Sequence, residues 1–407
     1  MAYKLIEGGG VTTPQGFLAG ACYVGVKSRK SEKPDVAIIY SEQPASCAAM
    51  FTTNKFCAAP VILDREILKK GKARAVVINS GNANAATGTQ GIEDAKRVET
   101  EAEKLLNLGE DEVFVCSTGV IGQKLPVEKV LDGVRRIVPE LSKDKGTDAA
   151  WAIMTTDTVR KEVAYEMELS GGTVRIGAMA KGSGMIHPNM ATMLAYITTD
   201  AKVEASVLQG MLKKSTDKSF NMMTVDGDTS TNDSLFLLAN GASGVAVETE
   251  EDKAAFAALL DDICMDMARR IASDGEGATH LMVVEAYGLP TEKDAKLVAR
   301  SIAGSTLFKA AMFGADANWG RVLCAIGYSG APVNVHKVDV AFRSAAGTVR
   351  VCVDGAGIPF SEEEAKKVLL EKEIEILVDL KSGDEGATAW GCDLTYDYVK
   401  INGDYRT

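Results

Sequence analysis

The chain has 407 residues, of which 46% are hydrophobic and 25% charged, a composition typical of globular proteins rather than disordered ones. Its length is too large for one compact core and predicts two domains. The formal net charge of −11, with no compensating basic run, argues against a nucleic-acid partner and an anionic-membrane partner. A local basic pocket for a phosphate-bearing cofactor stays open.

The N-terminal residues contain neither the apolar core of a secretory signal nor the Arg- and Ser-rich pattern of a transit peptide. The longest largely apolar stretch, residues 234–247, is interrupted by polar residues and is too short to span a bilayer. We therefore expect a soluble, cytoplasmic protein. The eight cysteines are scattered and only three histidines could join them, so we expect buried free thiols and no metal site.

Strand and helix patterns alternate along the first part of the chain. Short β-branched or aromatic runs at 76–78 and 113–115 predict strands, and apolar residues at helical spacing predict a helix over 92–106 between them. Pro126 opens a second helix, with an apolar face that extends to residue 137. This order predicts an α/β or α+β layered domain.

The second part of the chain continues this pattern. We expect strands at 174–179, 192–198 and 234–238, and helices at 207–219 and 254–271. A strand at 281–286 begins a smaller α/β unit with helices at 293–302 and 361–370, the latter opened by a capping box of Ser361 and Glu364. The boundary near residue 280 is soft because no linker marks it. We expect the chain to end in a strand.

A loop rich in glycine and proline, KGSGMIHPNMATML from Lys181 to Leu194, places Ala191 and Thr192 at the start of an apolar strand. A threonine hydroxyl needs an adjacent base, and the α-amine of an N-terminal threonine supplies one, with an unperturbed pKa of about 7.7–8.0. The motif predicts that the chain cuts itself between Ala191 and Thr192 by an N-to-O acyl shift. The glycines and the proline could hold the strained backbone. An incidental threonine in a core strand is the alternative.

Other polar groups could serve this chemistry. Thr118 and Gly119 follow a strand and could aim two donors at an oxyanion, or they could form an ordinary turn. The amide-rich segment 79–84 could position a polar ligand or form a network of side-chain to backbone bonds. Lys181 could hold a substrate carboxylate or be a solvated loop lysine. Glu276 could meet a substrate ammonium or only end a helix.

Eight segments, in order along essentially the whole chain, resemble the ornithine acetyltransferase family of arginine biosynthesis, also called glutamate N-acetyltransferase. The segments are FTTNKFCAAPV from Phe51, NSGNANAATG from Asn79, STGVIG from Ser117, KGSGMIHPNMATML from Lys181, DGDTSTNDS from Asp226, DGEGAT from Asp274, FGADANWGR from Phe313 and the closing WGCDLTYDYVKINGDYRT. Eight ordered matches are far more specific than any one of them.

The resemblance implies self-cleavage into an α chain, residues 1–191, and a β chain, residues 192–407, which assemble as two α and two β chains. It implies a layered αββα sandwich of the N-terminal-nucleophile-like type over residues 1–280. The smaller α/β domain, residues 281–407, would send its C-terminal tail back to the active site. The acetyl group of N-acetylornithine would pass to Thr192 and then to glutamate in a ping-pong reaction. No cofactor or metal is implied, and the use of acetyl-CoA as donor stays open.

The resemblance also implies roles by motif position. Thr192 would be the nucleophile, cleavage would follow Ala191, and Thr118 and Gly119 would form the oxyanion hole. The substrate-binding residues would be Thr155, Lys181, Thr192, Glu276, Asn402 and Thr407. One position departs from the family, because DGEGAT is usually followed by lysine and here by His280. This departure puts the local charge in doubt.

Two rival functions stay open at this point. An N-terminal-nucleophile aminopeptidase or amidase on a related fold would share the self-cleavage but would pass the acyl group to water. A catalytically silent binding protein would remain a single uncut chain.

Overall fold

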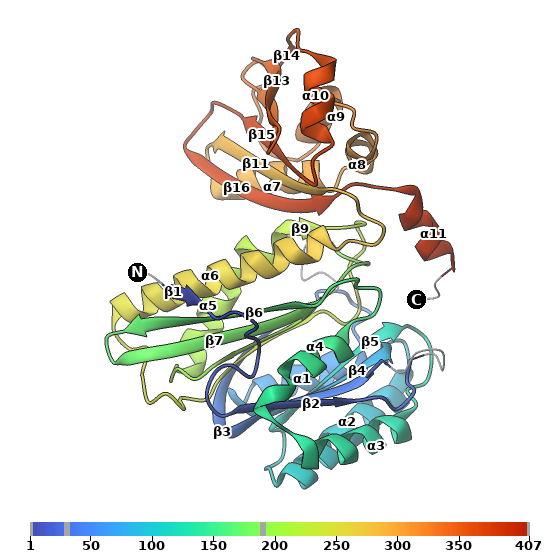
Figure 1. The fold of residues 1–407 in the computed structure, drawn as a ribbon, viewed down its shortest axis with the longest axis vertical. Helices are drawn as coiled ribbons and strands as arrows, with labels where there is room; N and C mark the ends of the chain where they lie inside the picture. Colours follow the sequence, from blue (N-terminus) through green and yellow to red (C-terminus); the bar gives the residue numbers. More distant parts are fainter. Residues whose placement is uncertain (1–2, 28–32, 188–192, 405–407) are drawn as a thin grey trace.

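The computed structural model describes residues 3–27, 33–187 and 193–404, which form a larger body and a smaller one (Figure 1). The strands are β1 (Tyr3–Leu5), β2 (Phe17–Cys22), β3 (Val36–Phe51), β4 (Lys72–Asn82), β5 (Val113–Val120), β6 (Lys161–Leu169), β7 (Gly172–Lys181), β8 (Leu194–Thr199), β9 (Met223–Thr224), β10 (Ser234–Ala239), β11 (Leu281–Leu289), β12 (Asp339–Ser344), β13 (Gly347–Val353), β14 (Ala356–Gly357), β15 (Glu373–Asp379) and β16 (Glu385–Cys392). The α-helices are α1 (Ala59–Leu68), α2 (Gly88–Leu106), α3 (Val127–Ile137), α4 (Gly146–Ile153), α5 (Ala205–Lys218), α6 (Glu250–Ser273), α7 (Glu292–Ala303), α8 (Thr306–Phe313), α9 (Trp319–Gly327), α10 (Glu362–Leu369) and α11 (Tyr396–Asp404).

The larger body is organised around one bent sheet. Its described strands follow the order β1-β6-β7-β8-β10-β3-β4-β5, and β2 pairs with β3 outside this path. The first half of β3 pairs with β2 and β4, whereas its second half, 46–51, pairs with the whole of β10. A register shift in the β3–β4 pairing between Tyr40 and Ala45 separates the two halves. One long strand therefore joins two half-sheets.

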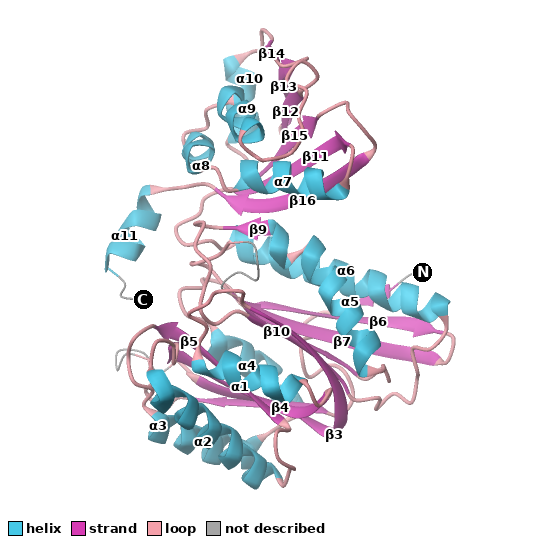
Figure 2. Cartoon of the chain, turned by 180° about the vertical axis from the view of Figure 1, so that it is seen from behind, coloured by secondary structure: helices cyan, strands magenta, loops and turns pink. Residues whose placement is uncertain are grey.

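The helices and strands of this body form layers in αββα order (Figure 2). Three apolar clusters fill the spaces between these layers. The outer clusters lie between α2–α3 and the β3–β4–β5 half-sheet, and between α5–α6 and the β6–β7–β8–β10 half-sheet. The inner cluster joins the facing sides of the two half-sheets and includes α4. Alternation along β4 supports this arrangement, because Val77 belongs to an outer cluster and Ile78 to the inner one. The layered αββα prediction is confirmed.

The smaller body contains a second sheet in the order β14-β13-β12-β15-β11-β16-β9 among the described residues. Apart from β9, all of its strands lie at Leu281 or later in the chain. Its edge strand β9 comes from the larger body, where Met223 pairs with Trp390 of β16. One apolar cluster also continues from α6 into the smaller body. The two bodies therefore share part of their core.

The predicted elements correspond closely to the structure, with one exception. The predicted strands are found as β4, β5, β7, β8, β10 and β11, and the predicted helices as α2, α3, α5, α6, α7 and α10. The hydroxyl of Ser361 accepts from the amide of Glu364, as a capping residue does. The expected C-terminal strand is wrong, because α11 ends the described chain. Thr395 caps α11 by accepting from the amide of Tyr398 at 3.2 Å, and this outweighs the β-prone sequence YDYV.

The environment of the cysteines partly confirms the expectation of buried free thiols. All eight are free, and Cys47, Cys116, Cys264, Cys352 and Cys392 are buried. The remaining three, at positions 22, 57 and 324, are partly or largely exposed. Separately, no helix in the described part of the chain combines the length and apolar character needed to cross a bilayer.

Candidate active site

Six of the residues predicted for the active site line one cavity of about 160 Å³. They come from distant parts of the sequence and are Thr118, Gly119, Thr155, Lys181, Glu276 and Asn402. The cavity is completed by Ile121, Thr156, Gly184, Met185, Asp226, Asp228, Ser230, Thr231, Asn232 and Tyr398. The predicted Ala191, Thr192 and Thr407 lie outside the described residues. A larger hollow of about 860 Å³, around Trp151 and Arg160, contains none of the predicted site residues.

The end of β5 supplies one wall of the cavity. Gly119 has φ +132° and pairs with Gly81 of β4, and a Cβ on Gly119 would overlap the Gly81 backbone. Only glycine fits such a close approach of two strands. The side-chain amide of Asn232 donates to the carbonyl of Ser117 at 2.8 Å and so ties this strand to the segment before β10. The backbone at Thr118 and Gly119 is thereby fixed, as preorganised oxyanion donors require.

The amide-rich segment 79–84 is a turn network and does not reach the cavity. The side-chain amide of Asn79 donates to the carbonyl of Asn82 at 2.9 Å, and that of Asn84 donates to the carbonyl of Gly91 at 2.9 Å. Asn82 in turn accepts from the amide of Asn84 at 2.8 Å. The plainer of the two interpretations of this segment is therefore correct.

Lys181 ends β7 and is only 3% exposed. Burial lowers the pKa of its ammonium, and the nearby carboxylates of Asp157 and Glu276 oppose that shift. Within the described residues, no carboxylate lies within ion-pair distance of the Lys181 ammonium. An unpaired buried cation is costly, so this side chain is suited to bind an anionic group of a ligand.

Glu276 reaches the cavity from the loop after α6. Its backbone amide donates to the carbonyl of Ser183 at 2.8 Å, and the side chain of Asn402 in α11 donates to its carboxylate at 2.7 Å. A Cβ on Gly184 would overlap the Glu276 carboxyl group. The glycine therefore makes room for the acid.

The described part of the loop after β7 is strained at Met185, not at the glycines. Met185 has φ +58°, whereas Gly182 and Gly184 do not have positive φ. The carboxylate of Asp226 accepts from the amides of Met185 and Ile186 at 2.6 and 2.9 Å, which stabilises this unfavourable conformation. The expectation that the glycines hold strain is wrong for these two positions, and Pro188 lies outside the described residues.

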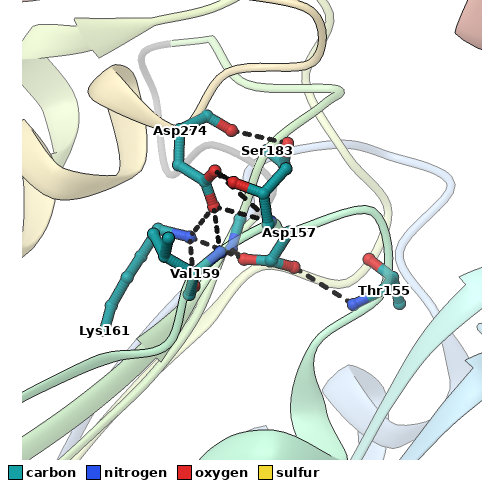
Figure 3. A network of polar contacts seen from close by, with 8 residues as sticks. Thr155, Asp157, Val159, Lys161, Ser183 and Asp274 are labelled. Carbon is teal, nitrogen blue, oxygen red and sulfur yellow. Dashed lines mark hydrogen bonds and ion pairs between the residues drawn. The ribbon is translucent and has the colours of Figure 1, made fainter.

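The structure also contains a buried ion cluster that was not predicted from the sequence (Figure 3). The ammonium of Lys161 lies 2.8 Å from the carboxylate of Asp157 and 2.6 Å from that of Asp274. Burial alone would raise the pKa of Asp157, but the ammonium groups of Lys181 and Lys161 hold it below its ordinary value. Asp157 and Lys161 are four positions apart, but Asp274 is 113 positions from Lys161, so the complete cluster forms only in the folded chain.

This cluster connects the loops that carry the predicted binding residues (Figure 3). Asp157 accepts from the amide of Thr155 at 3.1 Å and from that of Gly182, next to Lys181, at 2.7 Å. The carbonyl of Asp274 accepts from the hydroxyl of Ser183 at 2.7 Å. The cavity-lining loops are thus connected by the carboxylate of Asp157 and the backbone carbonyl of Asp274.

The charges that line the cavity are asymmetric. Lys181 is the one cation among its described lining residues, which also include the acids Asp226, Asp228 and Glu276. Burial raises the pKa of Asp226, whose carboxylate oxygens accept hydrogen bonds from the amides of Met185 and Ile186. The Lys181 ammonium can bind an anionic group of a ligand, and the acidic side chains can bind a cationic group. An amino acid with a second ammonium group carries both kinds of charge.

The unusual His280 does not line the cavity. Its Nδ1 lies 3.0 Å from the carboxylate of Asp393, and its backbone amide donates to the same side chain at 3.0 Å. His280 thus fixes the chain after Glu276 to the end of β16. Among the residues that the structure describes, no group of three or more histidine, cysteine or acidic side chains is arranged to hold a metal ion.

Comparison with known proteins gives one consistent family. The ArgJ family matches residues 18–407. The arginine biosynthesis bifunctional protein ArgJ of Caldanaerobacter subterraneus subsp. tengcongensis is 52% identical over 401 residues, which cover 98% of this chain and 99% of that protein. Its namesake in Symbiobacterium thermophilum is 50% identical over 401 residues, with coverage of 98% and 99%.

A solved structure was also found to be similar. The ornithine acetyltransferase of Mycobacterium tuberculosis, complexed with ornithine, is 40% identical and has a TM-score of 0.43, and the match covers 46% of this chain and 98% of that one. The family match and the two full-length relatives are sufficient to assign the family, since each match spans nearly all of the sequence. This chain belongs to the ArgJ family.

Proposed function

We propose that this protein is a self-processing acetyltransferase of arginine biosynthesis that moves the acetyl group of N-acetylornithine to glutamate. The observation that carries the proposal is the cavity, where six predicted residues between positions 118 and 402 meet. Membership of the ArgJ family and the names of its relatives, bifunctional proteins of arginine biosynthesis, agree with it.

The first step of the proposed mechanism is self-cleavage. The hydroxyl oxygen of Thr192 attacks the carbonyl carbon of Ala191, the carbon–nitrogen bond breaks, and the hydroxyl proton ends on the Thr192 nitrogen. Water then hydrolyses the resulting ester, which frees the Ala191 carboxylate, the Thr192 hydroxyl and the Thr192 α-amine. This amine is the base that the hydroxyl lacked in the intact chain.

The second step transfers the acetyl group. The α-amine takes the hydroxyl proton while the oxygen attacks the acetyl carbon of N-acetylornithine, and Thr118 and Gly119 stabilise the developing oxyanion. The proton passes to the leaving nitrogen of ornithine, and the acetyl group remains as an ester on Thr192. The amine of glutamate then attacks this ester, releases N-acetylglutamate and returns the hydroxyl.

Lys181 and Glu276 divide the recognition of N-acetylornithine between them. The Lys181 ammonium binds the substrate carboxylate, and the Glu276 carboxylate, oriented by Asn402, binds the δ-ammonium. Thr155 and Thr407 complete the substrate site in this proposal.

Glutamate lacks a side-chain ammonium, so Glu276→Gln should raise KM for N-acetylornithine far more than KM for glutamate. Equal KM changes for both substrates would rule out this role for Glu276; Glu363→Gln, on the exposed α10, is the matched control.

A product assay separates transfer from the amidase alternative. Purified protein is incubated with N-acetylornithine, with and without glutamate. The proposal predicts N-acetylglutamate only when glutamate is present, and release of ornithine in equal amount. Free acetate formed at the same rate in both reactions would instead identify a hydrolase. Replacing N-acetylornithine with acetyl-CoA in the same assay decides whether acetyl-CoA is a donor.

The assembly and location of the enzyme are part of the same proposal. We infer that the α chain, 1–191, and the β chain, 192–407, stay associated as two copies of each, in the cytoplasm. The extensive pairing of β7 with β8 supports this association, because these strands lie on either side of the cleavage position. Light scattering of the cleaved protein should give a mass near twice that of the 43.1 kDa chain.

A further inference from the structure

Asp233 is a buried acid directly beside the start of β8. It is 0% exposed and precedes Ser234, the first residue of β10. Its carboxyl oxygen Oδ1 accepts from the amide of Met193 at 3.0 Å, and the amide of Ser234 donates to the carbonyl of Met193 at 3.2 Å. Both backbone groups of Met193 are therefore held by this segment.

The second oxygen of the Asp233 carboxyl group is unusual. Oδ2 is buried, and no well-aligned hydrogen bond reaches it among the described residues. Burial raises the pKa of this carboxyl well above its ordinary value, although Met193, Lys181 and the hydroxyls of Thr52 and Ser230 oppose the shift. A buried polar atom without a well-aligned partner costs free energy. The contact of this side chain that bears on the proposed nucleophile is the one from Oδ1 to Met193.

The neighbouring residue, Asn232, makes a comparable contact with β5. Asn232 donates to the carbonyl of Ser117, the residue before Thr118. Two consecutive side chains thus hold the strand of the proposed oxyanion hole and the strand that follows the proposed nucleophile. Met193 follows Thr192 in the chain, so its amide nitrogen belongs to the peptide group that joins the two residues.

We propose that Asp233 is a positioning residue for Thr192, through its hydrogen bond to the amide of Met193. This inference rests on the proposed function, because it takes Thr192 as the nucleophile. A fixed Met193 amide anchors the chain directly after the proposed nucleophile during both self-cleavage and acetyl transfer. A misplacement of about 1 Å at a reacting centre can cost roughly 100-fold in rate.

Three variants test the role of Asp233. Asp233→Ala removes the oxygen that holds Met193, whereas Asp233→Asn keeps an acceptor oxygen in the same place and loses only the acid. The matched control is Asp200→Ala. Asp200 is 1% exposed and follows the other end of β8. Its carboxylate accepts from the amides of Gln15 and Arg175, so Asp200→Ala removes comparable buried hydrogen bonds at a place that does not line the cavity.

Self-cleavage is followed by intact mass during cell-free synthesis, and acetyl transfer by N-acetylglutamate formation. For Asp233→Ala we expect cleavage and kcat to fall by about 10- to 100-fold, with KM for N-acetylornithine within about twofold of wild type. Asp233→Asn should stay within about threefold of wild type in both rates, because Met193 keeps its partner. Asp200→Ala should lower Tm without slowing cleavage.

Two results would overturn the inference: wild-type rates in Asp233→Ala, or an Asp233→Asn that is as slow as Asp233→Ala. The second would mean that the acid itself, and not the hydrogen bond to Met193, is needed. If Asp233→Ala does not fold, Asp233→Ser provides the same test, since its shorter side chain does not reach Met193. A wild-type chain that neither cleaves nor makes N-acetylglutamate would refute the proposed function instead, so the two failures are distinguishable.

Discussion

Two neighbouring regions of the larger body each bury a lysine, and they use it differently. In the ion cluster, Lys161 opens β6 and contacts the carboxylates of Asp157 and Asp274. At the cavity, Lys181 ends β7 and has no ion-pair partner among the described residues. The two strands are paired, with Lys161 opposite Ala180, and the charge of Lys161 contributes to the lowered pKa of Lys181.

This difference separates structural charge from functional charge. A buried ammonium that contacts two carboxylates is neutralised inside the protein and holds loops together. A buried ammonium without an ion-pair partner can instead bind the anionic group of a ligand. Asp157 connects the two regions, because it contacts Lys161 directly and opposes the lowering of the pKa of Lys181. Four predictions test this division, beginning with the largest expected effect.

Removing the structural cation should destabilise the protein strongly. Lys161→Met leaves two buried carboxylates without their cation, so we expect the free energy of unfolding in urea to fall by about 3–5 kcal/mol. The matched control is Lys367→Met, which breaks an exposed pair with Glu363 and should cost less than about 1 kcal/mol. Equal effects of the two substitutions would show that the cluster does not hold the loops.

Removing the functional cation should damage activity and spare stability. Lys181→Met should lower kcat/KM for N-acetylornithine by about 30- to 1,000-fold, because the substrate carboxylate loses its partner. The free energy of unfolding should stay the same or rise, since an unpaired buried ammonium is removed. A large loss of stability with little loss of activity would reverse the assigned roles.

The pH profile of activity should also report Lys181. Burial lowers the pKa of Lys181 below its ordinary value of 10.5, so the free enzyme loses this cation as pH rises through that lowered pKa. We therefore expect kcat/KM for N-acetylornithine to fall on the alkaline side before pH 10.5. Lys181→Arg should shift this decline to higher pH, because a guanidinium stays charged. A profile unchanged by this substitution would exclude Lys181 as the alkaline group.

The C-terminal helix should give the smallest and most selective effect. None of the residues of α11 is buried, yet Asn402 contacts Glu276. Asn402→Ala should raise KM for N-acetylornithine by about 3- to 10-fold, the value of one typical hydrogen bond, with Tm unchanged. Lys400→Ala, on the same helix, is the control and should leave KM unchanged; a matching rise there would point to a general effect on α11.

The sequence was most informative where a residue is fixed by backbone or motif. At Gly119 a Cβ would overlap Gly81, and at Gly184 it would overlap Glu276, so only glycine fits at these two positions. The segments that contain them are therefore specific enough to identify the site. The β-branched run within β4 and the apolar face of α3 likewise identified their elements.

The sequence was least informative where partners are distant in the chain. Lys161 and Asp274 are separated by 113 positions, and Asp233 meets Met193 across 40, so no local pattern marks either contact. The long strand β3 was also missed, since its centre, SEQP, is polar and contains a proline that is atypical of strands. Tertiary pairing with three other strands outweighs this local preference.

Intact mass of the purified wild-type chain and of Thr192→Ala is the most direct measurement of the central claim. We predict that wild type gives two fragments, residues 1–191 and 192–407, and that the larger mass gains one acetyl group on incubation with N-acetylornithine alone. Thr192→Ala should remain a single chain of 43.1 kDa without added acetyl. An uncut wild type, or a Thr192→Ala that is cut or acetylated like wild type, would contradict the account.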